Sequence, residues 1–439
     1  MFHSLRRVGF FALFLLICSV VPATSVETLT FQKVLADGLE NSFDSRINAE
    51  NVNASRAAVL ESKADYYPQL SLRFGQEYVH VYEQNSAVAS VGDTVYSDYT
   101  SKYKHSLSLY AQYNLYDFGR RRLGVHYADQ QVAISELQKD QSRFENSQKL
   151  LDLYSQGLRL QKQRAVQKKI LSGRKRIFEL TQQLLQAGKY GHQVVADAAI
   201  ALAQTISQLD RLQIDFQATL DNLAFYTRTS YAAEQIYLDD FKLGDGVEDL
   251  VVHAAKFPDI RSLQQQIERK ETELAIARYE LLPKLNLRGS YGMYGSDDNS
   301  FSDSLEQMGK RDTSVTLSFV LPLFDGFAAS AKKQRLQHDI ARLRVEKEKA
   351  LANLDNTINS ARRSFLSLQN RKGERSQQKR RIYQQNNDYD RLSEQQLTDQ
   401  MTLVQKSIEL EQHHLDNDLQ ELDAAAAAIL LTLLQEAGS

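Results

Sequence analysis

A strand-like segment that ends in a tight turn and continues into a long helix-like segment occurs twice in this chain. The first copy reads LSLYAQYNLYDFGRRR over residues 107–122, and the second reads VTLSFVLPLFDGFAAS over residues 315–330. Apolar residues occupy every second position of both runs, which is the period of a β-strand. Asp and Gly beside a Phe then favour a change of backbone direction and the start of a helix. The sequence therefore predicts two corners at which a strand feeds a helix.

The repetition extends upstream of both corners. YYPQLSLR over residues 66–73 matches LLPKLNLR over residues 281–288, and the proline of each segment lies where a helix must stop and a strand begin. We interpret the chain after its first 25 residues as two copies of one unit, residues 26–240 and 241–439. Each unit is expected to contain a helix, two strands joined by a loop, a long helix and a second helix. The residues expected to form the corners are Pro68, Asp117, Gly119, Pro283, Asp325 and Gly326.

Four long strands are predicted, at about residues 69–82, 104–117, 284–295 and 312–324. Their length and their aromatic residues are typical of strands in outer-membrane barrels, and the edge of a soluble β-sandwich is the alternative. Four strands cannot close a membrane barrel, and an open strand edge is not tolerated in lipid. Several copies of the chain must therefore associate, and their number is left open by this argument.

The helices are unusually long. A stretch without proline runs from Arg120 to about Ala187, which corresponds to about 100 Å at 1.5 Å per residue. Large and apolar residues recur within it at seven-residue spacing, as in a coiled coil. A shorter helix over residues 193–228 should return along this one, and a helix over residues 44–65 should cover the remaining length. A solvated fibrous rod is the alternative interpretation.

The N-terminal residues 1–25 have the pattern of a secretory signal peptide. Arg6 and Arg7 precede an apolar run that is shorter than the ~20 residues of a membrane-spanning helix, and small residues follow. The single cysteine of the chain, Cys18, lies inside that run. We therefore expect export and a mature chain without disulfides.

Composition argues against nucleic acid as a partner and against catalysis. The chain has 53 basic and 55 acidic side chains, so its formal charge of −2 provides no general attraction to nucleic acid. No HExxH, phosphate-binding loop or GxSxG motif occurs, and the adjacent His413 and His414 point to different sides of a helix. We expect no enzyme activity, no cofactor and no metal site.

The four segments YYPQLSLR, LLPKLNLR, LYDFGRRR and PLFDGFAAS, in this duplicated order and with long flanking helices, resemble those of TolC-family outer-membrane channels. The resemblance implies a mainly α fold in which a long coiled-coil helical barrel continues a membrane β-barrel. Each chain of a homotrimer would contribute four strands to a 12-stranded barrel in the outer-membrane lipid, and the helical tunnel would cross the periplasm. A periplasmic adaptor (membrane fusion) protein and an inner-membrane transporter are the implied partners.

This resemblance predicts an exit duct of a tripartite efflux pump or of a type I secretion system, a passive conduit driven by its inner-membrane partner. The alternative is a non-channel structural coiled-coil or adaptor protein that bridges the envelope. An adaptor would be expected to contain one helical hairpin and a soluble β domain. The two hairpins and two strand pairs predicted here favour the conduit.

Two helical turns, at residues 188–192 and 399–402, should form the periplasmic tip, where the tunnel closes and the adaptor docks, because they lie farthest from the strands. The family's tip motif corresponds to residues 185–188 and 397–400, and the second copy lacks its Gly. The positions where family members often carry aspartates correspond to Gln405 and Ile408, with Asp399 and Glu409 nearby. We therefore expect closure by helix packing instead of a carboxylate ring. The expected tip residues are Gly188, Lys189, Tyr190, His192, Asp399, Gln400, Met401, Thr402 and Gln405.

Overall fold

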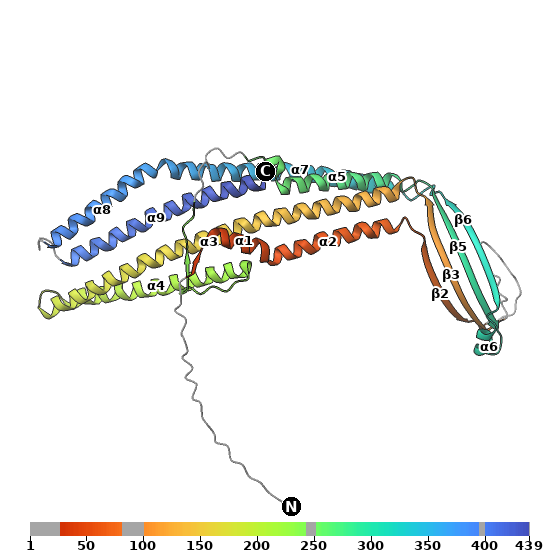
Figure 1. Ribbon diagram of the computed structural model, residues 1–439, viewed down its shortest axis with the longest axis horizontal. Helices are drawn as coiled ribbons and strands as arrows, with labels where there is room; N and C mark the ends of the chain where they lie inside the picture. The colour runs from red at the N-terminus through yellow and green to blue at the C-terminus, as the bar shows by residue number, and fades with distance from the viewer. Residues whose placement is uncertain (1–26, 81–100, 243–251, 395–399, 439) are drawn as a thin grey trace, which may run out of the picture.

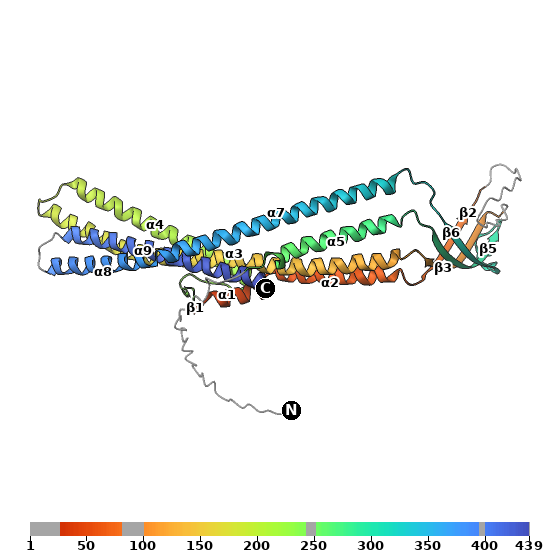
Figure 2. The same cartoon turned by 90° about the horizontal axis from the view of Figure 1, so that it is seen from above.

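The computed structural model of this protein describes residues 27–80, 101–242, 252–394 and 400–438. The described chain is an elongated set of helices with a small curved sheet at one end (Figures 1 and 2). The predicted signal peptide, residues 1–25, lies outside the described residues and stays a prediction.

The first half of the chain is organised along one very long helix. This helix, α3 (Arg120–Gln186), is uninterrupted over the stretch that lacks proline. The helix α2 (Phe43–Ala64) packs along the part of α3 nearest the sheet, and α4 (His192–Thr227) packs along the far part (Figure 1). The short α1 (Phe31–Asn41) precedes α2. Two shorter helices therefore line one long helix, as the sequence predicts.

The second half has the same order of elements, with its long helix divided. Its helices are η2 (Ala254–Lys256), α5 (Pro258–Arg278), α6 (Phe301–Glu306), α7 (Ala328–Asn370), α8 (Lys372–Glu394) and α9 (Gln400–Ala437). The expected single long helix is split between α7 and α8 at Arg371. Among the described residues, no helix is long and apolar enough to span a membrane.

The four long strands form one antiparallel sheet in the order β2-β3-β5-β6. They are β2 (Gln69–Tyr78), β3 (Tyr103–Tyr116), β5 (Lys284–Asp297) and β6 (Lys310–Val320). The last two residues of the strand predicted over residues 69–82 lie outside the described residues. The strand predicted over residues 312–324 starts earlier and ends before Pro322, because a proline cannot donate to the ladder. β2 and β6 are the edges of the sheet within one chain.

A second, smaller sheet ties the N-terminal segment to the middle of α3. The strands β1 (Glu27–Leu29) and β4 (Ile236–Leu238) pair in parallel. The Tyr154 hydroxyl of α3 lies 2.7 Å from the carbonyl oxygens of both Leu29 and Asp239, and burial raises the pKa of this hydroxyl. This strand pair was not predicted from the sequence. Fully buried side chains of the surrounding core include Leu150, Leu158, Phe216, Leu220 and Leu223.

Candidate functional site

The aspartate of each corner caps the helix that follows it. Asp325 Oδ2 accepts a hydrogen bond from Ala329 N at 2.7 Å, and Asp117 Oδ2 accepts one from Arg121 N at 2.9 Å. Each carboxylate thus satisfies a free backbone N–H in the first turn of the helix, and this N–H belongs to the residue four positions after the aspartate. Asp117 Oδ1 accepts a further hydrogen bond from Gly119 N at 3.2 Å. The two corners share this device, which fixes the direction in which the helix leaves the sheet.

Both corners also contain two consecutive residues in the left-handed backbone region. Their φ angles are +59° and +88° at Phe118 and Gly119, and +65° and +67° at Gly326 and Phe327. The glycine comes second at one corner and first at the other, so a Phe adopts the costly conformation in both. Sequence reasoning recognised the glycines but not that each Phe shares their conformation.

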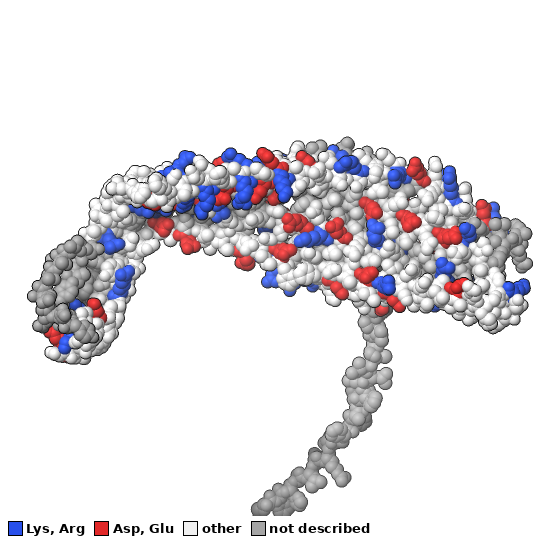
Figure 3. Space-filling model, turned by 180° about the vertical axis from the view of Figure 1, so that it is seen from behind, with Lys and Arg blue, Asp and Glu red and all other residues white. Residues whose placement is uncertain are grey.

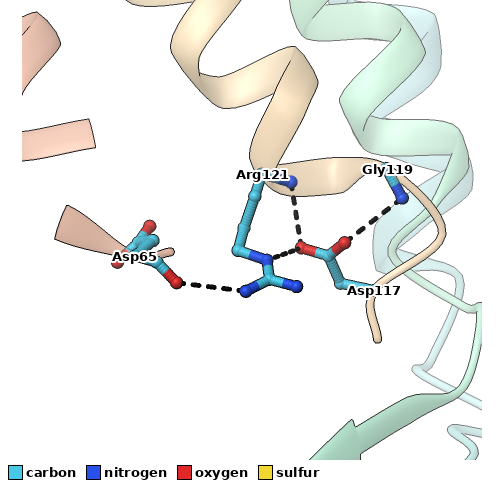
Figure 4. Close-up of polar contacts among 4 residues, drawn as sticks. All are labelled: Asp65, Asp117, Gly119 and Arg121. Carbon is cyan, nitrogen blue, oxygen red and sulfur yellow. Dashed lines mark hydrogen bonds and ion pairs between the residues drawn. The ribbon is translucent and has the colours of Figure 1, made fainter. Parts of the chain in front are cut away.

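The first corner is anchored to the preceding helix through Arg121. Its Nε donates to Asp117 Oδ2 at 3.0 Å, and its Nη1 donates to the carbonyl oxygen of Asp65, just after α2, at 3.3 Å (Figure 4). The side chains of Arg121 and Asp117 are only 14% and 8% exposed. This largely desolvated ion pair holds the ends of α2 and β3 and the start of α3 together.

A polar cavity of about 400 Å³ lies beside this corner. Its lining includes Asp117 from the first half of the chain and Pro283 from the second, so two predicted corner residues meet here. Pro68 lies between α2 and β2, and Pro283 lies between α5 and β5. The connections that carry the corner residues therefore lie at one level of the molecule, between the sheet and the helices (Figure 1).

The turn between α3 and α4 is a Schellman motif centred on Gly188. This residue has a φ of +70°, and its N–H donates to Leu185 O at 2.9 Å. The Lys189 N–H donates to Leu184 O, also at 2.9 Å. These two bonds satisfy the last carbonyls of α3 and reverse the chain. The predicted turn over residues 188–192 is thus present, except that His192 is already the first residue of α4.

The second predicted turn, residues 399–402, is wrong in its position. Gln400, Met401 and Thr402 form the first turn of α9, and Asp399 lies outside the described residues. The segment has no Gly, and its Gln and Met favour helix, so the helix starts earlier than expected. The helix α8 ends at Glu394 and α9 begins at Gln400, and the two helices lie side by side (Figure 1).

Near this end, α9 packs on α3 through both apolar and polar contacts. Met401 is partly buried against a cluster that includes Ile408 and two isoleucines of α3. Arg174 Nη1 donates to Gln405 Oε1 at 3.2 Å, so the Gln405 side chain faces α3 in this chain. One turn further, a hydrogen bond from Lys406 lowers the pKa of the Glu409 carboxyl. Neutral and paired side chains, not free carboxylates, thus occupy the described contacts of α3 with α9 here.

The strand register divides the large sheet into two chemically different faces. One face presents Leu70, Leu72, Phe74, Leu107, Leu109, Tyr291, Val315, Leu317 and Phe319. The opposite face presents Ser71, Arg73, Ser108, Tyr110, Gln112, Arg288, Ser290, Asp312 and Ser314. Leu72 and Val315 are 67% and 75% exposed, so the apolar face is largely uncovered in a single chain. The alternation of apolar and polar residues was visible in the sequence. The pairing of the four strands is needed to show which residues of neighbouring strands lie side by side on one face.

The helical part carries charges of both signs, interspersed along its length (Figure 3). Within the described ranges, no group of three or more His, Cys, Asp or Glu residues is placed to hold a metal ion. The features that the fold brings together are therefore surfaces and turns: a two-faced sheet, the corners beneath it and a helical tip.

A sheet with an uncovered apolar face, continued by long helices, belongs to the class of proteins that present apolar surface to a membrane or to a partner. The sequence matches the family described as outer membrane efflux protein over residues 34–227 and 253–391, and the chain belongs to this family. Outer membrane protein OprJ of Pseudomonas aeruginosa is 23% identical over 355 residues, which cover 77% of this chain and 70% of OprJ.

Solved structures of other outer-membrane proteins share the fold. VceC from Vibrio cholerae superposes with a TM-score of 0.69 at 18% identity, covering 92% of this chain and 96% of VceC. The CmeC channel of Campylobacter jejuni superposes with a TM-score of 0.70 at 15% identity, covering 93% and 85% of the two chains. The predicted TolC-like fold, with mainly α structure and a set of strands, is confirmed.

Family membership also confirms the predicted class of function. The chain is a passive outer-membrane efflux channel protein with a periplasmic helical tunnel, and not an enzyme. The alternative of a non-channel structural or adaptor protein is set aside. Members of this family are trimeric channels that work with periplasmic adaptor and inner-membrane pump proteins.

Proposed function

We propose that three copies of this chain close a 12-stranded barrel in the outer membrane and form the exit duct of a tripartite efflux pump. The observation that carries the proposal is the two-faced sheet. Its apolar face would contact lipid, and its polar face would line a water-filled lumen. Efflux is favoured over type I secretion because the matched family is described by efflux.

The edges of the sheet support assembly. β2 and β6 each pair on one side only within the chain. In lipid, each unpaired backbone group would cost several kcal/mol, and an antiparallel pairing of β6 with β2 of the next copy would remove that cost. About twelve strands leave a lumen wide enough for water, whereas about eight would be filled by side chains. Three copies satisfy both the edges and the duct, as four would, and the number three comes from the resemblance to TolC-family channels.

We further propose that the turn of residues 188–192, the end of α8 and the start of α9 form the periplasmic tip. The 67 residues of α3 span about 100 Å, so this turn and these helix ends lie at the opposite end from the strands (Figure 1). A periplasmic adaptor protein would dock there, and an inner-membrane transporter would supply the cargo. The contacts of Arg174 with Gln405 and of Met401 with α3 support closure by helix packing.

The assembly is tested on protein purified from outer membranes in detergent. We expect a mass of three chains by light scattering and discrete conductance steps after insertion into planar lipid bilayers. Recovery as a monomer that is soluble without detergent would contradict the proposal. A trimer that inserts without any conductance would instead revive the non-channel alternative.

A further inference from the structure

The short helix α6, in the segment between β5 and β6, packs on the apolar face of the sheet. It lies at the sheet end away from the long helices (Figure 1). His105 of β3 and Gly295 of β5 are register partners in a row that shares this face with Leu107 and Leu109. A Cβ atom on Gly295 would come within 2.0 Å of the Ser304 carbonyl oxygen. The helix therefore covers the apolar face and not the polar one.

His105 is the anchor of this contact. Its ring is 1% exposed, and its Nδ1 lies 2.7 Å from Ser304 Oγ. The Ser304 hydroxyl also lies 2.8 Å from the Phe301 carbonyl oxygen, so His105 is connected to the backbone of α6 through Ser304. The Phe301 ring packs edge-on against His105, with centroids 4.6 Å apart. The helix α6 thus shields His105, a polar residue on the apolar face, from contact with solvent or lipid.

The apolar side chains of α6 remain partly exposed and continue the apolar surface beneath the helix. Phe301 and Leu305, which lie four residues apart on one side of the helix, are 44% and 45% exposed. Asp303 and Glu306 lie on the other side. In the next row of the same face, the Tyr78 and Tyr103 rings are 5.2 Å apart, and Tyr78 is 61% exposed. An aromatic and apolar belt therefore follows this end of the sheet.

We propose that α6 is a membrane-interface helix, which rests on the outside of the barrel rim and inserts Phe301 and Leu305 into the headgroup region of the outer leaflet. The proposal rests on the proposed membrane barrel. Lipid is the occupant because the exposed side of α6 is continuous with the face that contacts lipid, and aromatic residues concentrate where hydrocarbon meets headgroups. Docking through His105 and Gly295 holds the helix against the wall, whereas a free loop would extend into water.

The protein contains no tryptophan, so one introduced indole reports its own surroundings. We suggest three single variants reconstituted in liposomes: Phe301→Trp on α6, Leu72→Trp on the apolar face and Tyr110→Trp on the polar face. Lipids with quenchers at shallow or deep positions and aqueous iodide are the probes. We expect shallow lipid quenching for Phe301→Trp, deep lipid quenching for Leu72→Trp and quenching only by iodide for Tyr110→Trp.

Quenching of Phe301→Trp by iodide alone, as in Tyr110→Trp, would overturn the inference while leaving the barrel intact. If Leu72→Trp is also quenched only by iodide, the proposed position of the sheet in the membrane is wrong. The proposal for α6, which rests on it, is then wrong as well. Shallow lipid quenching that is lost when a copurifying protein is removed would identify a protein partner instead of lipid and would also overturn the proposal.

The docking is tested by a matched glycine pair on β5, each combined with Phe301→Trp. Gly295→Ala places a methyl group against Ser304 and should release α6, so the indole loses most of its lipid quenching. Gly289→Ala lies on the same strand and face, where the nearest atom to a Cβ is 4.0 Å away, and should change nothing. Equal quenching in the two variants would show that the contact with Gly295 does not hold the helix.

Discussion

Asp117 and Asp325 show how single residues set the angle between the sheet and the helices. Each carboxylate caps the helix that follows, and each is followed by a Phe and a Gly in left-handed conformations, in opposite order. Only glycine adopts this conformation without cost. The strained Phe118 and Phe327 are 39% and 73% exposed, so their rings are available to contacts outside one chain.

At this scale, we predict that Gly119→Val impairs folding of the first corner. A β-branched residue at a φ of +88° should cost about 1–3 kcal/mol, although an added Cβ would meet no atom within 4 Å beyond the adjoining backbone. Thermal unfolding of the detergent-solubilised trimer measures the loss. Gly119→Asn is the control, because Asn tolerates the left-handed region and should lose little. Equal stability of the Val variant and the wild type would show that the conformation of Gly119 carries no such cost.

The helical turns are the elements on which the tip proposal depends. The Schellman motif at Gly188 ends α3 with two hydrogen bonds, whereas Gln400, Met401 and Thr402 continue as helix. The turn predicted for the first hairpin is therefore present, whereas residues 400–402 of the second hairpin are helical. Their packing against each other, through Arg174 and Gln405, joins the ends of α3 and α9.

At the element scale, we predict that Gly188→Lys abolishes export and leaves trimer formation and membrane insertion intact. A lysine at a φ of +70° disturbs the motif and places a charge at the proposed docking site, while the barrel lies about 100 Å away. Export by cells and the mass of the purified protein are the two measurements. Gly188→Asn, which suits the same backbone conformation, should retain export. Normal export by the Lys variant, or failure of its trimer, would contradict the tip assignment.

At the scale of the whole molecule, the orientation of the two sheet faces determines which side chains line the proposed lumen. Arg73 and Arg288 lie on the polar face, which we propose lines the lumen, and three chains would repeat each of them. Arg311 lies on the opposite face, in the row of Phe74 and Leu107. Charges that line a pore bias ion passage much more strongly than charges outside it.

At this scale, we predict that Arg288→Gln shifts ion selectivity toward cations. The measurement is the reversal potential of single channels in a salt gradient. Arg311→Gln removes the same charge from the same sheet and should leave the reversal potential unchanged. A larger shift for Arg311→Gln than for Arg288→Gln would reverse the assignment of lumen and lipid faces.

Local signals predicted much of this molecule. The absence of proline after Arg120 predicted α3 nearly to the residue, and the Gly in the turn at residue 188 marked the reversal into α4. Where a local signal was missing, the prediction failed: residues 400–402 lack a Gly and are helical, and no feature of the repeat indicated the break at Arg371. Turn and helix propensities act over a few residues, so they can be read from a single segment.

The sequence by itself determined the long helices, the four strands, the corner aspartates and the family to which the chain belongs. Only the tertiary structure decided that β3 pairs with β5 across the two halves, that β1 closes on β4, and that α6 covers His105 on the apolar face. The two strand pairings join residues more than a hundred positions apart in the sequence. The position of α6 depends on which of the two faces of the sheet this short helix packs against. Their free energy comes from burial and pairing between distant segments, so no local pattern of residues specifies them.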